Sequence, residues 1–166
     1  RHIGVLVDLP GPKVRMGSFG NTPVLLESGA PLTLVPGLDT SDTSVIGVDY
    51  VDLLMDVHPG DRLAVGDGSV VLQVESVDGD SAKATVLHGG PVQGRPGLHI
   101  PSDRLSMSTP TPEDLRLLDA FVDEGVDMVA ISFVRSAHDI RRIGTEPYPR
   151  GPLIVAKIET RAAVEN

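Results

Sequence analysis

The chain has 166 residues, of which 40% are hydrophobic, and a formal net charge of −9 at pH 7; this length suffices to bury a core in one large domain or two small ones. The chain is negatively charged and its 14 Lys and Arg residues are scattered, which excludes general electrostatic binding of nucleic acid. Only 3% of the residues are aromatic, too few to form stacking platforms for bases. The absence of cysteine excludes disulfides and thiolate metal sites, and no apolar run reaches the ~18 to 20 residues of a membrane span, so we expect a soluble, cytoplasmic protein that does not bind membranes.

The first part of the chain combines a buried strand with a block of short strands. Residues 2–9, HIGVLVDL, form a nearly continuous apolar run that is typical of a parallel strand buried on both faces. Two prolines and a glycine follow in PGPK, residues 10–13, and fix a tight loop. From residue 17 to residue 104, short alternating runs are separated by Gly, Asp, Ser and Pro. This texture predicts six to eight short antiparallel strands in a small barrel or sandwich.

The residues after this block carry a helix signal. Thr111 is a capping residue, Pro112 would occupy the first helical position, and Asp114 lies three residues after the cap. These are the marks of a helix start. Apolar residues then recur at helical spacing as far as Gly125, where the helix is expected to end.

Buried strands and helices alternate through the rest of the chain. Further strands are expected within DMVAISFV, residues 127–134, and PLIVAKIE, residues 152–159, and each precedes a segment with a helix cap. Without the β insertion, this order gives three βα units of a parallel α/β fold, for which an arc of a (β/α)₈ TIM barrel fits best. Because three strands cannot close a barrel, we expect a piece of a larger protein, or missing strands supplied by a partner. The expected domains are a partial barrel, residues 1–16 and 105–166, and an inserted β-barrel domain, residues 17–104.

Polar residues stand where each of the three parallel strands should end. They are Asp8 after the first strand, Ser132 with Arg135 after the second, and Lys157 with Glu159 after the third. Catalytic groups of α/β barrels lie at the carboxyl ends of the strands. Side chains two positions apart on a strand share a face, so Lys157 and Glu159 are expected to point together toward the barrel mouth while Ile158 points into packing. An internal ion pair that only closes the barrel top is an equally good interpretation of the spacing.

The residue types at these strand ends suit a hard divalent cation. With oxygen donors and no thiol, the pattern favours Mg²⁺, which takes one or two carboxylates and leaves its other positions to substrate oxygens. Glu159 is the candidate ligand. Lys157 beside it could neutralise charge that develops on a phosphoryl group or an enolate oxygen.

Five stretches of the sequence together resemble the pyruvate kinase family. The resemblance runs in family order over nearly the whole chain, through VDLPGPKVRMG, GDRLAVGDGSVVLQV, GGPVQGRPGLHIPSDRLS, TPEDLRLLDAFVDEGVDMVAISFVRSAHDI and IVAKIETRAAVEN. It implies that the chain runs from the third barrel strand to the helix after the fifth. The β block would be the mobile lid domain inserted after the third strand.

The resemblance also implies roles for individual residues. Lys157 would stabilise phosphoryl transfer and the enolate, and Glu159 would be a ligand of the catalytic Mg²⁺ or Mn²⁺. Arg15 matches a catalytic arginine that contacts nucleotide phosphates. Ser132 and Phe133 match the pair that lines the substrate pocket.

The sequence departs from the family pattern at the monovalent-cation site and in the lid. Asp8 matches the acidic residue at the monovalent-cation site, but Lys13 in LPGPK resembles members that are active without K⁺, so we expect no K⁺ requirement. A lysine ammonium imitates an ion only if it is held in place. In the lid, where the family often has two lysines, Arg95 and Pro96 stand instead, and Arg95 becomes the candidate nucleotide-binding cation.

The resemblance favours a pyruvate kinase of glycolysis, which transfers a phosphoryl group between phosphoenolpyruvate and ADP/ATP and whose complete form is a homo-oligomer, a tetramer in the family. Because family segments before residue 1 and after residue 166 carry further ligands, this chain alone is expected to be inactive. One alternative is a non-catalytic binding or regulatory module that kept the lid and part of the barrel. Another Mg²⁺-dependent barrel enzyme acting on pyruvate or its enolate is a third interpretation, and the inserted β domain speaks against it.

Overall fold

A computed structural model describes residues 3–101 and 106–166 of the chain, which divides into two compact units. One unit, called the α/β unit below, comprises Arg1–Pro12 and Met107–Asn166, and the other, called the β unit, comprises Lys13–Ser106. The predicted domain boundary after residue 104 lies outside the described residues, as does His2 of the first apolar run. The roles of catalytic barrel and lid stay predictions.

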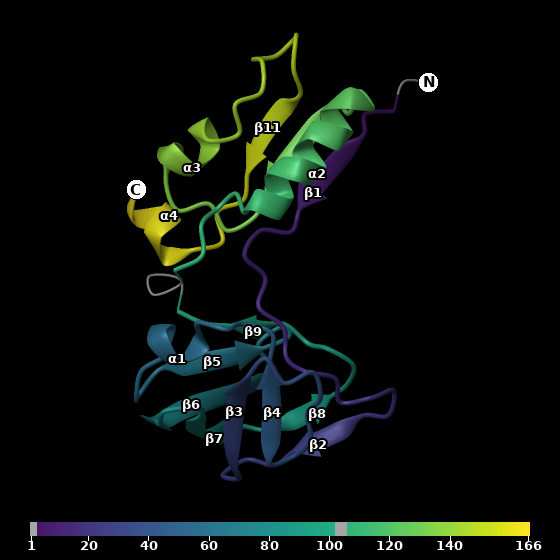
Figure 1. Ribbon diagram of the computed structural model, residues 1–166. Coiled ribbons are helices and arrows are strands. Elements are labelled where there is room, and N and C mark those ends of the chain that lie inside the picture. Colours follow the sequence, from purple (N-terminus) through teal and green to yellow (C-terminus); the bar gives the residue numbers. More distant parts are fainter. Residues whose placement is uncertain (1–2, 102–105) are drawn as a thin grey trace. The chain divides into compact units, whose positions relative to one another are not determined.

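The α/β unit is built on a parallel three-stranded sheet in the order β1-β10-β11. Strands and helices alternate as the sequence predicts, and Figure 1 shows α2 lying along the sheet. The elements are β1 (Leu6–Leu9), α2 (Pro112–Asp123), β10 (Met128–Ile131), α3 (Ala137–Arg141), β11 (Leu153–Ala156) and α4 (Arg161–Glu165). The central strand pairs Leu9 with Ile131 and Ile131 with Ala156, so all three strands end at one edge.

The two faces of this sheet differ in burial. One face packs against the helices and forms the core of the unit, whose buried members are Leu9, Leu118, Val129, Ile131, Val134 and Ile143. The alternation of a strand places the other set of side chains on the opposite face. There Leu6, Leu153 and Val155 are 47%, 46% and 38% exposed. The sheet therefore has one covered face and one open apolar face within this unit.

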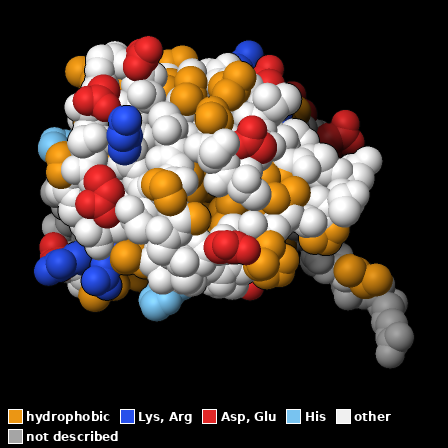
Figure 2. Space-filling model, turned by 90° about the horizontal axis from the view of Figure 1, so that it is seen from below, with side chains coloured by type: hydrophobic (Ala, Val, Ile, Leu, Met, Phe, Trp, Pro, Cys, Tyr) orange, Lys and Arg blue, Asp and Glu red, His pale blue; other side chains and the backbone are white. Residues whose placement is uncertain are grey.

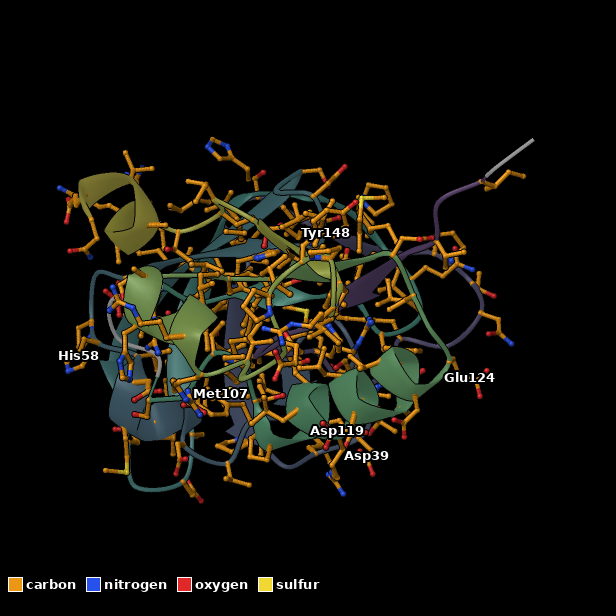
Figure 3. All side chains as sticks on the ribbon, turned by 90° about the horizontal axis from the view of Figure 1, so that it is seen from above. Asp39, His58, Met107, Asp119, Glu124 and Tyr148 are labelled. Atoms are coloured by element: carbon orange, nitrogen blue, oxygen red, sulfur yellow. The ribbon has the colours of Figure 1, made fainter. Side chains whose placement is uncertain are left out.

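Helix α2 begins with the predicted capping box. The Thr111 hydroxyl accepts from the Asp114 amide at 3.1 Å, and Asp114 Oδ2 accepts from the Thr111 amide at 2.8 Å. The other carboxylate oxygen, Asp114 Oδ1, accepts from the Gly11 amide at 3.0 Å. Because Asp114 is only 1% exposed, its carboxylate ties the loop after β1 to the start of α2. The acidic side chains of Asp119 and Glu124, in contrast, are exposed and project outward from this helical segment (Figure 3).

The β unit contains a six-stranded sheet in the order β4-β3-β7-β6-β5-β9 and a two-stranded sheet of β2 and β8. Its elements are β2 (Val24–Leu26), β3 (Pro31–Pro36), β4 (Val45–Val48), α1 (Leu53–Asp56), β5 (Arg62–Val65), β6 (Val70–Val77), β7 (Ala82–His88), β8 (Gly90–Val92) and β9 (Leu98–His99). The expectation of antiparallel pairing throughout is wrong for one pair, because β3 and β4 run parallel. The chain between them doubles back across β4, and a Cβ on Gly47 would lie 2.0 Å from the Leu38 carbonyl oxygen. Only a glycine permits that crossing.

Both edges of the six-stranded sheet bond to one short segment. Met16 forms a bridge with Val48 at the end of β4, and Arg15 forms a bridge with Gly97 next to β9. The Leu98 amide also donates to the Val14 carbonyl at 2.9 Å. Residues 14–16 therefore occupy edge hydrogen bonds at both ends of the sheet, which limits unpaired strand edges in this unit.

A buried carboxylate holds the last residue of the β unit. Asp56, 5% exposed, accepts from the Tyr50 hydroxyl, from the Ser106 amide at 2.9 Å and from the Ser106 hydroxyl at 2.7 Å. Burial, together with the hydrogen bond and charge of Asp56, raises the pKa of Tyr50 to about 12. Burial opposes the charged form of Asp56 as well, but its hydrogen bonds outweigh burial and lower its pKa.

Two features are relevant to membrane association: the side chains on the surface and the character of the helices. On the face shown in Figure 2, acidic side chains are scattered among hydrophobic ones. Within residues 3–101 and 106–166, no helix has the length and apolar character that crossing a membrane requires.

We predict that Asp114→Ala destabilises the α/β unit more than Thr111→Ala does. The first change leaves the Gly11 and Thr111 amides without their acceptor, at a cost of about 1 to 3 kcal/mol, whereas loss of a cap hydroxyl costs about 1 kcal/mol. Urea unfolding followed by circular dichroism measures both. Glu113→Ala is the control, because its exposed ion pair with Arg116 contributes little. Equal stability of Asp114→Ala and Glu113→Ala would contradict this account.

Candidate active site

The carboxyl edge of the parallel sheet collects polar side chains from all three strands. Asp8 lies in β1, Ser132 follows β10 directly, and Lys157 follows β11 directly. The Lys157 amide donates to the Ile131 carbonyl at 3.0 Å, which extends the pairing of β10 and β11 by one step. The register of the sheet therefore brings together residues that are up to 149 positions apart in the sequence.

The ammonium of Lys157 is surrounded by acceptors. Its Nζ lies 3.0 and 3.2 Å from the two carboxylate oxygens of Asp8 and 3.1 Å from the Ser132 hydroxyl. Glu159 Oε1 lies 3.3 Å from the same nitrogen. The lysine side chain is 30% exposed, so the charged group is tied to the protein and still reaches solvent.

Electrostatics favour the charged form of this lysine. Partial burial opposes the ammonium, but hydrogen bonds to Asp8 and Glu159 and the charges of both carboxylates outweigh it and hold the pKa of Lys157 above its usual value. Lys157 is therefore a permanent cation at neutral pH. It cannot serve as a general base there.

Glu159 is oriented by a backbone amide in an unusual conformation. Its Oε2 accepts from the Phe133 amide at 3.0 Å. Phe133 has φ of 56°, in the left-handed region that non-glycine residues rarely adopt. The loop after β10 thus presents an amide to the carboxylate that the sequence suggests as a metal ligand.

The sequence places Ile158 in the packing, and the structure does not. The side chain of Ile158 is 60% exposed. Strand β11 ends at Ala156, and three of its four residues are exposed, so β11 is an uncovered edge strand in this unit. The prediction that Lys157 and Glu159 stand side by side is nevertheless met by their 3.3 Å contact.

The β unit holds a second polar cluster around the two predicted nucleotide-binding arginines. The Arg15 guanidinium donates to the Arg95 carbonyl at 3.1 Å, and the Arg15 amide donates to Asp49 Oδ1 at 2.5 Å. The Arg95 guanidinium lies 3.7 Å from Asp49 and 3.8 Å from the exposed Asp39. The two arginines are therefore neighbours, and their role in nucleotide binding stays a prediction. Asp49 and Asp39 could not be predicted from the sequence, because these contacts depend on strand bridges between distant segments.

Asp8 and Lys13 are the residues that the sequence suggests for the monovalent-cation site. The Asp8 carboxylate binds the Lys157 ammonium through both oxygens. Lys13 is exposed and is the first residue of the β unit. The proposed exchange of K⁺ for the charge of Lys13 stays a prediction.

The site offers few of the donors that a divalent cation needs. Across the described ranges, no cluster of three or more His, Cys, Asp or Glu residues that could hold a metal is present. Glu159 supplies one carboxylate whose oxygens each bond to one protein group, and Mg²⁺ usually takes one or two carboxylates with the rest from water or substrate. Glu159 could therefore contribute one carboxylate to such an ion, and its role as a metal ligand stays a prediction.

Comparison with known proteins assigns the chain to a family. The family model described as pyruvate kinase, barrel domain, matches residues 1–166. Proteins named pyruvate kinase from Mycobacterium intracellulare and Mycobacterium tuberculosis are each 34% identical over 100% of this chain, and one from Aeropyrum pernix is 36% identical over the same share. The chain belongs to the pyruvate kinase family. It spans 36% of the length of the two mycobacterial relatives and 35% of the third.

We predict that Asp8→Asn lowers the pKa of Lys157. The substitution keeps an oxygen near the ammonium but removes a negative charge that favours it. The stabilisation that the raised pKa represents is complete below the unfolded value of about 10.4 and is lost as the pH rises through the folded value, so the variant should be less stable than the wild type at neutral pH, and this difference should disappear at alkaline pH. An NMR titration of the ¹³Cε signal of Lys157 measures the shift, and an unchanged pKa would contradict the prediction.

Proposed function

We propose that the whole protein containing this chain is a pyruvate kinase that transfers the phosphoryl group of phosphoenolpyruvate to ADP in glycolysis. The observation that carries the proposal is the 3.3 Å pairing of Lys157 with Glu159 at the carboxyl edge of three parallel strands, in a chain that matches the family from end to end. A fixed cation beside a carboxylate is what charge development on an enolate or phosphoryl oxygen requires.

In this proposal the α/β unit is an arc of a TIM barrel and the β unit is its inserted lid. The alternation of strand and helix and the parallel order β1-β10-β11 support the first part. So does the open apolar face with Leu6, Leu153 and Val155, because such a face is stable in water only when further strands and their side chains fill the barrel interior. A lid that closes over the nucleotide would exclude water from the transfer.

Lys157 would act as an electrostatic stabiliser. An ammonium has three N–H donors, and Asp8, Ser132 and Glu159 surround them. The contact with Glu159 is the longest of these, so a substrate oxygen could replace it while the other two hold the nitrogen in place. The charge then stays next to the oxygen on which negative charge develops.

Glu159 would hold a divalent cation, Mg²⁺ or Mn²⁺, together with ligands from the rest of the protein. Bound there, such an ion supplies charge neutralisation at phosphoryl oxygens. The Phe133 amide fixes the orientation of the carboxylate before any ion arrives, which reduces the reorganisation that binding requires.

Arg15 and Arg95 would bind the nucleotide phosphates. Each guanidinium group offers planar, bidentate donors for phosphate oxygens, and the Arg15 guanidinium contacts the Arg95 backbone carbonyl. We also propose that the complete protein is cytoplasmic, that it is a homo-oligomer, and that it works without K⁺ because Lys13 supplies a fixed charge.

The full-length protein should lose pyruvate formation when Lys157 is replaced by Met. Removal of the stabilising charge is expected to reduce kcat by at least about 100-fold. An assay coupled to lactate dehydrogenase, which consumes the pyruvate that is formed, measures the rate. Arg161→Met is the matched control, because it removes a nearby positive charge that pairs with Glu165 on the surface. Equal rates for wild type and Lys157→Met would remove the assignment and favour a non-catalytic module.

Replacement of K⁺ by tetramethylammonium at constant ionic strength should leave the rate of the full-length protein unchanged. Lys13→Glu, which reverses the charge, should make the same rate depend on K⁺, provided that the ammonium is held near the site. The same coupled assay, run as a K⁺ titration of both proteins, checks this. Strong activation of the wild type by K⁺ would contradict it.

A further inference from the structure

Ser132 is buried between the end of β1 and the ammonium of Lys157. The residue is 3% exposed. Its hydroxyl donates to the Leu9 carbonyl at 2.5 Å, and the carboxylate oxygen of Asp8 lies farther from it, at 3.3 Å. A hydroxyl has a single proton and two lone pairs. With the proton directed at Leu9, the lone pairs are left to accept from Lys157 Nζ at 3.1 Å.

Phe133, the next residue, makes the matching contact with Glu159. Its amide donates to Glu159 Oε2 at 3.0 Å, and its φ is 56°. A bulky residue keeps this conformation only where its surroundings determine it. Those surroundings include Gly11, where an added Cβ would lie 3.0 Å from Phe133 Cδ2. The ring therefore packs against the loop after β1 while the amide faces the carboxylate.

We propose that Ser132 and Phe133 are positioning residues, one holding the Lys157 ammonium and the other the Glu159 carboxylate, and that neither side chain binds substrate. The proposal rests on the proposed function and revises the role that the family resemblance suggests for this pair. The proton of the Ser132 hydroxyl is directed at the Leu9 carbonyl, and the residue is screened from solvent. A substrate oxygen would have to displace the Leu9 carbonyl to accept this proton.

Three roles for Ser132 make different predictions. A substrate ligand would raise the KM for phosphoenolpyruvate when removed. A purely structural residue would lower stability and leave kcat of the folded enzyme alone. A positioning residue would lower kcat and kcat/KM together, because the ammonium that it orients acts in the transition state.

The test uses the full-length protein with Ser132→Ala, Ser132→Cys and Ser132→Thr. Cysteine replaces the hydroxyl oxygen by a larger sulfur that is a weak acceptor, and alanine removes it, so Ala and Cys should both reduce kcat by about 10- to 100-fold, as expected for a lost hydrogen bond to a charged group. Thr keeps the hydroxyl and should retain most of the rate. A raised KM with normal kcat, or wild-type rates for both Ala and Cys, would overturn the proposal.

The variant Phe133→Gly distinguishes the role of the backbone amide from that of the aromatic ring. Glycine adopts positive φ without strain and keeps the N–H that faces Glu159, so the KM for phosphoenolpyruvate should be unchanged. A raised KM for this substrate would show that the ring contacts it and would overturn the assignment of Phe133.

A second readout does not require any enzyme activity. Reductive methylation of the full-length protein, followed by mass spectrometry, measures how accessible each lysine is. Ser132→Ala should speed methylation of Lys157 by up to about tenfold and leave the exposed Lys83 unchanged. An unchanged Lys157 rate would overturn the positioning role. A full-length protein that forms no pyruvate but shows the faster methylation would overturn the proposed function and leave the positioning role standing.

Discussion

The parallel register of β1, β10 and β11 is the constraint on which the site depends. Each strand ends in a polar group, and the pairing of Leu9 with Ile131 and of Ile131 with Ala156 brings these ends to one edge. A shift by one residue would turn every side chain to the opposite face and move Lys157 away from Asp8. The apolar core beneath the helices specifies this register, because it buries Leu9 and Ile131 on one face.

Hydrogen bonds and ion pairs compensate for the partial burial of the charged groups at this edge. Lys157 lies between the carboxylates of Asp8 and Glu159, and the site therefore carries an excess of negative charge until a cation or a substrate group is added. Exposure of the lysine and glutamate side chains, 30% and 36%, keeps the desolvation cost small.

Local patterns in the sequence predicted the elements well, and long-range contacts much less well. The capping box of Thr111 and Asp114 is confirmed because its residues are three positions apart. The contact of Asp8 with Lys157 was missed because it depends on strand register across 149 positions. The positive φ of Phe133 has no sequence signal, since the residue is not a glycine. Ile158 was placed wrongly because an apolar residue was assumed to be covered, and no element of its unit covers it.

The glycine of the loop after β1 links backbone geometry to chemistry. Gly11 has φ of 69°, and an added Cβ would lie 3.1 Å from Ser132 Cβ and 3.2 Å from the Ser132 carbonyl oxygen. A methyl group at this position would crowd Ser132, which contacts Lys157, without contacting a charged group itself. A substitution at position 11 would therefore alter the polar site through backbone contacts, although this position contributes no functional side chain of its own.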